Sequence, residues 1–131
     1  MVFGTFDGIH RGHLNFFKQA KKLAKNSFLI VSIARDINVK RIKDKIPDFS
    51  EKKRLVLVKK TRIADKVVLG GLNNYLSQIV KEDPDIIALG YDQRAYVKDL
   101  KKDLEINGLI TKVRRLKPYK AHIYKNHLLK K

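Results

Sequence analysis

Apolar and polar residues follow two different spacings along this chain. Residues 28–34, FLIVSIA, are nearly all apolar and several are β-branched, which predicts a strand buried on both faces. Residues 13–25 instead repeat apolar side chains at helical spacing, with lysines on most of the other positions. This pattern predicts an amphipathic helix that lies on a sheet and presents its lysines to water.

The two patterns recur along the chain. Ser50 is a suitable N-cap for a helix that follows it, and Gly108 a suitable C-cap for one that precedes it. Residues 36–46 predict a short helical or irregular stretch, and residues 119–131 a short terminal helix. Strands are predicted at 1–4, 28–34, 66–70, 85–90 and 109–113, and the longer helices at 13–25, 51–62, 74–82 and 95–107.

Strands that alternate with helices predict an α/β fold, a Rossmann-like doubly wound five-stranded parallel sheet with helices on both faces. A length of 131 residues predicts one domain over 1–131, in which 112–131 form a basic C-terminal segment made of a strand end and a short helix. Ligands of such sheets bind beyond the carboxyl ends of the strands, near the point where strand order reverses. We expect the loops after 1–4, 28–34 and 85–90 to meet there.

The first of these loops carries the candidate chemistry. Residues 4–13 read GTFDGIHRGH. Gly4 allows a tight turn, and backbone N–H groups near Thr5, Phe6 and the start of the next helix can face an anion. Phosphate is the anion that such a loop favours.

The two histidines of this loop are three residues apart. If the chain is helical from Ile9 onward, His10 and His13 share one face, and Gly12 leaves room for a phosphate to approach. Two imidazole N–H donors would then stabilise the charge that builds up on a phosphoryl group in its transition state. We expect His10 and His13 to be catalytic.

Other interpretations of these residues stay open. Two histidines at this spacing also bind zinc, although the chain has no cysteine and only Asp7 is nearby. They also occur as a purely structural pair. Asp7 either caps the turn or orients a neighbouring group.

The charge of the chain is unusual for its size. Thirty Lys and Arg against 13 Asp and Glu give a net charge of +17, which favours polyanionic partners such as nucleotides, nucleic acid or acidic lipid headgroups. Lysine-rich helix faces that point into water would give the same net charge without any polyanionic partner. No uninterrupted apolar run approaches ~18 residues, and neither cysteines nor a preceding secretory segment are found, so we expect a cytoplasmic protein without a membrane span.

Three segments together resemble one known family. GTFDGIHRGH is similar to the signature of the cytidylyltransferase-like nucleotidyltransferase superfamily, a Gly-Thr-Phe-Asp run followed by His-x-Gly-His. IARDINVKRIKDK with SEKKR resembles the basic loop and the Glu-x-x-Arg helix start of that family, and DIIALGYDQ its fourth strand and turn. The resemblance covers nearly the whole chain.

The resemblance implies transfer of a nucleoside monophosphate from a nucleoside triphosphate to a phosphorylated acceptor, with release of pyrophosphate. Mg²⁺ would arrive with the triphosphate, and no metal would be held by protein side chains alone. The nucleotide-binding positions would be Gly4, Thr5, Phe6, Gly12, Gly90, Tyr91, Asp92, Gln93 and Asn126. Those for phosphate or acceptor would be Asp7, Lys40, Lys43, Lys45 and Arg54.

The sequence departs from the family pattern in places. Asn126 and His127 stand where many relatives have a Ser/Thr pair that binds triphosphate oxygens. The first strand is a short stub, and residues 8–11 differ from the usual residue types. Family members often form dimers, which leaves both a monomer and a homodimer open.

The choice of substrate rests on short segments. ARD after the second strand and LGYDQ after the fourth favour the archaeal-type FAD synthetases, which join AMP from ATP to FMN. Glycerol-3-phosphate cytidylyltransferases, which use CTP, are the first alternative. A nucleotide-binding protein without transferase activity and a nucleic-acid binder are alternatives of other classes.

Overall fold

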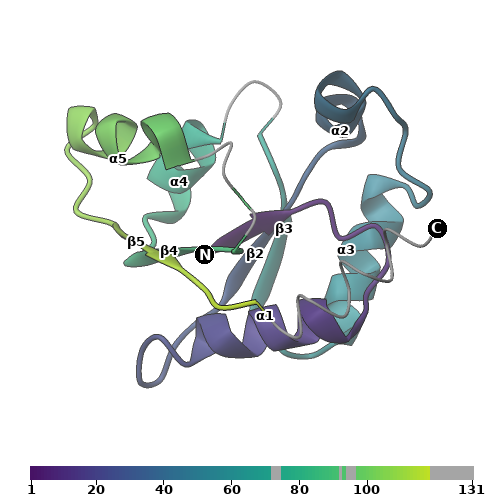
Figure 1. The fold of residues 1–131 in the computed structure, drawn as a ribbon, viewed down its shortest axis with the longest axis horizontal. Coiled ribbons are helices and arrows are strands. Elements are labelled where there is room, and N and C mark those ends of the chain that lie inside the picture. The colour runs from purple at the N-terminus through teal and green to yellow at the C-terminus, as the bar shows by residue number, and fades with distance from the viewer. Residues whose placement is uncertain (72–74, 92, 94–96, 119–131) are drawn as a thin grey trace.

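The computed structural model describes residues 1–71, 75–91, 93 and 97–118. Strands and helices alternate through these residues (Figure 1). No described helix combines the length and the apolar character needed to cross a membrane. The strands are β1 (Val2–Gly4), β2 (Ile30–Ile33), β3 (Lys66–Leu69), β4 (Ile86–Leu89) and β5 (Lys112–Arg115), and the helices are α1 (Arg11–Lys21), α2 (Asp36–Lys43), α3 (Glu51–Lys60), α4 (Leu76–Glu82) and α5 (Val97–Ile106).

The described strands form two parallel sheets, one of order β1-β2-β3 and one of β4 and β5. The parallel α/β class is therefore confirmed, and a single five-stranded sheet is not. Met1 connects the two sheets, because its amino group donates to the Ile86 carbonyl at 2.8 Å and its carbonyl accepts from the Ala88 N–H at 3.0 Å. Because β1 is only three residues long, these two hydrogen bonds stand in place of a longer ladder between β1 and β4.

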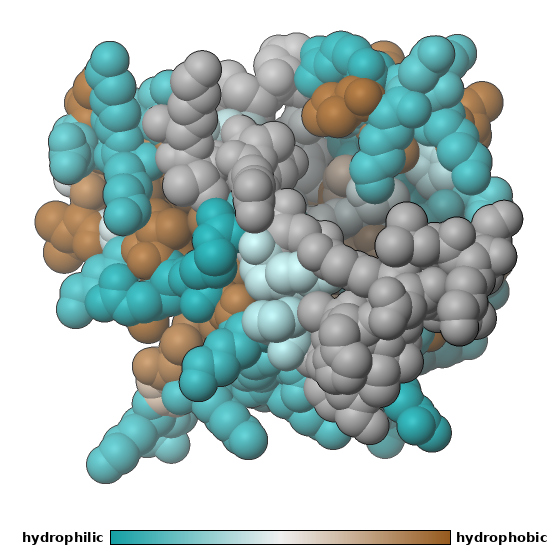
Figure 2. Space-filling model, viewed as in Figure 1, coloured by the Kyte–Doolittle hydropathy of each residue, from teal (hydrophilic) through white to brown (hydrophobic). Residues whose placement is uncertain are grey.

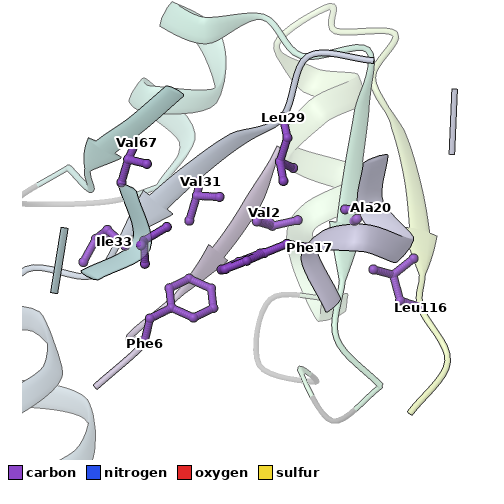
Figure 3. Packing of buried hydrophobic residues seen from close by; sticks show 11 residues of the cluster. Val2, Phe6, Phe17, Ala20, Leu29, Val31, Ile33, Val67 and Leu116 are labelled. Carbon is purple, nitrogen blue, oxygen red and sulfur yellow. The ribbon is translucent and has the colours of Figure 1, made fainter. Parts of the chain in front are cut away.

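Helices cover both faces of the strands, as Figure 1 shows. Alternate residues of β2 point to opposite faces: Val31 belongs to a buried cluster with Phe17 of α1, and Ile30 to another with Ile79 of α4. α3 adds to the first cluster and α5 to the second. Figure 3 shows the first cluster, in which the Phe17 ring lies between the strands and α1. Each strand face is therefore closed by two helices.

Element boundaries differ most from the predicted ones at two places. α1 begins at Arg11 and ends at Lys21, whereas the apolar pattern predicted a helix over 13–25. β5 occupies residues 112–115 instead of 109–113, because Gly108 turns the chain with φ +68° and the Lys112 N–H then pairs with the Asp85 carbonyl at 2.9 Å. Apolar Ile110, which suggested the earlier start, is 97% exposed. The predicted terminal helix at 119–131 lies outside the described residues.

The buried phenylalanine of α1 provides a test of this core. Phe17 is 0% exposed and Phe28 is 64% exposed. We expect Phe17→Ala to lower the free energy of unfolding by about 3–5 kcal/mol, because it removes buried apolar surface and leaves a cavity. Phe28→Ala, the matched control, should change it by less than about 0.5 kcal/mol. Urea denaturation of the three proteins measures both values, and equal losses would contradict this description of the core.

Candidate active site

Three loops meet where β1 ends. The Ala34 N–H, after β2, donates to the Gly4 carbonyl at 2.9 Å. From the turn after β4, the Gln93 side chain donates through Nε2 to the Phe3 carbonyl, also at 2.9 Å. The segment GTFDGIHRGH therefore lies between the loops that follow β2 and β4, at the carboxyl edge of the sheet.

The two histidines of this segment cap α1 reciprocally. His10 is the N-cap residue, with extended backbone (φ −129°, ψ 179°), and its Nδ1 accepts from the Gly12 N–H at 3.0 Å. His13 Nδ1 in turn accepts from the His10 N–H at 3.2 Å. The helix therefore does not extend back to Ile9, and His10 lies at its start. The two rings nevertheless meet, stacked with centroids 3.8 Å apart and planes 25° apart.

This capping fixes where each neutral imidazole carries its hydrogen. A nitrogen that accepts a hydrogen bond carries no hydrogen of its own, so both Nδ1 atoms are deprotonated. The hydrogen of each neutral ring therefore lies on Nε2. His10 and His13 together present two N–H donors of the kind that phosphate oxygens accept.

Two glycines make room for the rings of this segment. A Cβ on Gly12 would lie 2.7 Å from Cε1 of His10, and one on Gly4 would lie 2.6 Å from the Phe6 ring. Neither distance allows a side chain. Gly4 and Gly12 therefore act by letting other side chains approach the backbone closely.

Phe6 supports His13 from within the core. Its backbone is left-handed (φ 51°), its side chain is 6% exposed, and its ring meets the His13 ring edge-on at 5.4 Å between centroids. Figure 3 shows the Phe6 ring beside the buried cluster. Because the ring is buried, the backbone of Phe6 is the part left to meet a nucleotide, and that contact stays a prediction.

Burial keeps the His13 ring neutral. The pKa of His13 falls from 6.5 to about 4, first because burial disfavours the charged ring and second because His10 is close by. At neutral pH the His13 imidazole thus acts as a hydrogen-bond donor and carries no charge.

Asp7 joins this loop to the segment before α3. Its two carboxylate oxygens accept from the N–H groups of Asp48 at 2.7 Å and Phe49 at 2.8 Å. Burial raises the pKa of Asp7, but these two N–H donors and the charges of Arg54 and Lys45 outweigh it and leave the pKa below its ordinary value. The structure shows the turn-capping role for Asp7, and its predicted contact with substrate stays a prediction.

Arg54 is fully buried at the same junction. Its guanidinium donates to the Thr5 carbonyl at 2.8 Å, to the Phe49 carbonyl at 3.1 Å and to the Asp36 carboxylate at 2.6 Å. In this conformation Arg54 therefore positions the loop, and a direct phosphate contact stays a prediction.

Sequence analysis did not assign the partners of Arg54. Asp36 also accepts from the Glu51 N–H at 3.2 Å, and Glu51 accepts from the Asp36 N–H at 3.0 Å and from Arg35 at 3.1 Å. These bonds cap the first turns of α2 and α3 mutually. Their residues lie in the quoted segments ARD and SEKKR, but the pairing across 15 residues has no signal in the sequence.

The three candidate lysines differ in their distance from the loop. Lys43 Nζ lies 3.3 Å from Thr5 Oγ1. The charge of Lys45 acts on the Asp7 carboxylate. Lys40 is exposed on α2, one helical turn before Lys43. The structure brings Lys43 and Lys45 to the loop and leaves Lys40 at the surface.

The turn after β4 is closed by its own side chains. Gln93 Oε1 accepts from the Gly90 N–H at 2.7 Å, and the Gly90 carbonyl accepts from Arg115 at 2.7 Å. Arg115, at the end of β5, also donates to the Tyr91 carbonyl at 3.3 Å and was not predicted. Asp92 and Asn126 lie outside the described residues.

Two cavities are described, one beside the junction of the three loops and one at the other end of the strands. A shallow one of about 290 Å³ follows α1 and is lined by Arg11, Leu14, Asn15 and Lys18. A larger one of about 320 Å³ lies at the amino ends of β2 and β4, lined by residues such as Ser27, Leu29 and Pro84. Only the first is next to the histidines, so the larger cavity does not mark the junction of the three loops.

A magnesium ion that is bound together with the triphosphate stays a prediction. Among the described residues no three His, Asp or Glu side chains gather around one point. Both oxygens of Asp7 already accept backbone N–H groups. Mg²⁺ needs few protein ligands where phosphate oxygens and water supply the rest.

Comparisons with known proteins agree on one family. The cytidylyltransferase-like family model matches residues 1–128. The chain is 45% identical over 121 residues to an FAD synthase of Methanothermus fervidus, covering 92% of this chain and 83% of that protein. It is 34% identical over 131 residues to an FAD synthase of Thermoplasma acidophilum, covering 100% of this chain and 90% of that protein.

A solved structure agrees with the fold. The crystal structure of a lipopolysaccharide core biosynthesis protein from Thermoplasma volcanium superposes with a TM-score of 0.83 at 35% identity. The match covers 91% of this chain and 95% of that one.

The depressed pKa of His13 predicts how stability depends on pH. Between pH 6.5 and about 4 the unfolded chain binds a proton at His13 that the folded chain does not, so unfolding becomes easier as the pH falls. His13→Gln should remove this contribution and keep a capping acceptor at the same position. We expect the free energy of unfolding to fall more between pH 7 and pH 5 in the wild type than in His13→Gln, measured by urea denaturation. Equal falls in the free energy of unfolding of the two proteins would contradict a depressed pKa of His13.

Proposed function

Because this chain belongs to the cytidylyltransferase-like family and is a nucleotidyltransferase, we propose that it transfers AMP from ATP to FMN, forming FAD and releasing pyrophosphate. The observation that carries the proposal is the pair of stacked imidazoles at the end of β1, on a chain similar over nearly its whole length to FAD synthases. The similarity supports the substrates, and the paired donors support the chemistry.

The reaction is a displacement at phosphorus. A phosphate oxygen of FMN attacks the α-phosphorus of ATP, the bond from that phosphorus to the bridging oxygen breaks, and pyrophosphate leaves with the electron pair. Negative charge accumulates on oxygens around the α-phosphorus. We assign the Nε2–H groups of His10 and His13 to these oxygens, since preorganised donors lower the barrier most when they face developing charge.

The remaining residues of the site position the substrates. Lys43 and Lys45 are assigned to the phosphates, because one reaches Thr5 and the other acts on Asp7 at the same loop. Lys40 would act on the approaching nucleotide from farther out. The glycine-rich backbone of the loop and the turn after β4 would hold the nucleotide, through Gly4, Thr5, Phe6, Gly12, Gly90, Tyr91 and Gln93.

Magnesium completes the proposal as a partner of ATP. When bound, Mg²⁺ would neutralise charge on the triphosphate and on the leaving pyrophosphate. Phosphate oxygens and water would supply most of its ligands. We propose a cytoplasmic setting, where both ATP and FMN are present.

A pyrophosphate-release assay tests the substrates. We expect turnover with Mg²⁺, ATP and FMN, and product with the mass of FAD. A panel of four nucleotides against FMN, glycerol 3-phosphate, phosphocholine and phosphopantetheine includes the competing substrates. Turnover with CTP and glycerol 3-phosphate but not with FMN would reverse the assignment. Nucleotide binding without turnover anywhere in the panel would indicate a binding protein.

Replacing either imidazole tests the catalytic assignment. We expect His10→Ala and His13→Ala each to lower kcat by roughly two to three powers of ten, because each removes one donor to the transition state. The KM for ATP should change far less. Stopped assays of pyrophosphate release give both constants. Thermal melts check that the variants are folded, and kcat within threefold of wild type in a folded variant would remove that histidine from the mechanism.

A further inference from the structure

Three apolar side chains between the last turn of α2 and the start of α3 are exposed to solvent. They belong to the last turn of α2 and to the segment that joins α2 to α3: Ile42 is 71% exposed, Ile46 is 65% exposed and Phe49 is 39% exposed. We call these three residues the α2–α3 apolar patch. Figure 2 shows apolar side chains among hydrophilic ones over α2, at the upper right. Exposed apolar groups that cluster next to a polar site are a common sign of ligand binding.

The patch borders residues 4–13, the histidine loop, through Phe49. The Phe49 N–H donates to the Asp7 carboxylate at 2.8 Å, and the Phe49 ring lies 3.8 Å from the point that a Cβ on Gly8 would occupy. Lys43 adjoins Ile42 in the chain and reaches Thr5. Lys45 adjoins Ile46, and its charge acts on Asp7. Apolar residues and lysines therefore share one short segment, which also contains Asp44 and Asp48.

We infer that the α2–α3 apolar patch binds the isoalloxazine ring of FMN while Lys43 and Lys45 hold its phosphate. This inference rests on the proposed function and names the part of the chain that recognises the acceptor. FMN combines a planar, largely apolar ring with a phosphate at the end of a ribityl chain. The segment from Ile42 to Phe49 offers one partner for each end of that molecule.

The chemistry of the patch distinguishes this acceptor from smaller ones. Glycerol 3-phosphate has a phosphate for the lysines and no ring for the apolar side chains. An aromatic ring that stacks on Phe49 gains about 0.5–1.5 kcal/mol beyond the burial of its surface. Ile42 and Ile46 would lose exposed apolar area on the same contact. The patch thus adds affinity for FMN over a small phosphorylated acceptor.

Comparing the binding of FMN and riboflavin separates the contribution of the ring from that of the phosphate. Quenching of flavin fluorescence measures Kd for FMN and for riboflavin, which has the ring without the phosphate. We expect Ile46→Ser and Phe49→Ala each to raise both Kd values about threefold to tenfold. Lys43→Ala should raise Kd for FMN by a similar factor and leave Kd for riboflavin unchanged. KM for FMN should rise with Kd, and KM for ATP should stay within twofold.

A matched surface isoleucine provides the control. Ile110 is 97% exposed and precedes β5, at the amino edge of the strands, so Ile110→Ser should leave both Kd values unchanged. Ile46→Ser keeps the test valid if Phe49→Ala proves unstable, since Ile46 is the more exposed side chain.

Two kinds of failure are distinguishable. If wild type converts FMN to FAD while Ile46→Ser and Phe49→Ala retain wild-type Kd and KM for FMN, the apolar patch is not the acceptor site and the proposed function stands. If these variants raise KM for ATP instead, the patch binds the nucleotide and the inference is overturned. If wild type neither binds nor converts FMN, the proposed function fails as well.

Discussion

The arrangement of the site depends on one buried charge. The Arg54 guanidinium, with no exposed surface, contacts carbonyls of the loop after β1 and of the segment before α3, together with a carboxylate at the start of α2. A buried guanidinium is costly unless its donors are satisfied, so these partners must all be in place when the chain is folded. Because Asp36 and Glu51 cap each other's helices as well, α2, α3 and the histidine loop take up their positions together. Lys43, at the end of α2, and Lys45, just after it, are therefore held near the loop by a fixed framework.

In the proposed function, the two histidines have a structural role and a chemical role at once. Each Nδ1 accepts a hydrogen bond from a backbone N–H at the start of α1. That bond leaves the hydrogen of the neutral ring on Nε2. Gly12 admits the His10 ring, and the Phe6 ring supports the His13 ring from the core. The contacts show the structural role of the pair, because both rings cap α1. The proposed phosphate role uses the same tautomer. A zinc site would compete with these caps, because both Nδ1 atoms already accept hydrogen bonds.

Most of the fold and the location of the candidate site could be predicted from the sequence, because both follow from local patterns. Strands such as 30–33 are continuous apolar runs, and their loops meet at one edge by the geometry of parallel strands. What the sequence could not show are features set by contacts between distant residues. The two-bond junction at Met1 interrupts the expected five-stranded ladder, and β5 starts three residues late because its register is set by Asp85. The partners of Arg54 are another such feature, since the Glu-x-x-Arg spacing does not reveal the three protein acceptors around its guanidinium.

The low pKa of His13 links the stability of the loop to its chemistry. A proton on Nδ1 of His13 would remove the acceptor of the His10 N–H and place two donors against each other, which would open the first turn of α1. Burial against Phe6 and the closeness of His10 oppose that protonation down to a pH of about 4. An exposed histidine, with its pKa near 6.5, would be protonated in a substantial fraction of molecules at slightly acidic pH. By burying the His13 ring, the fold keeps its cap on the His10 N–H closed well below neutral pH, with the N–H of the His13 ring placed on Nε2.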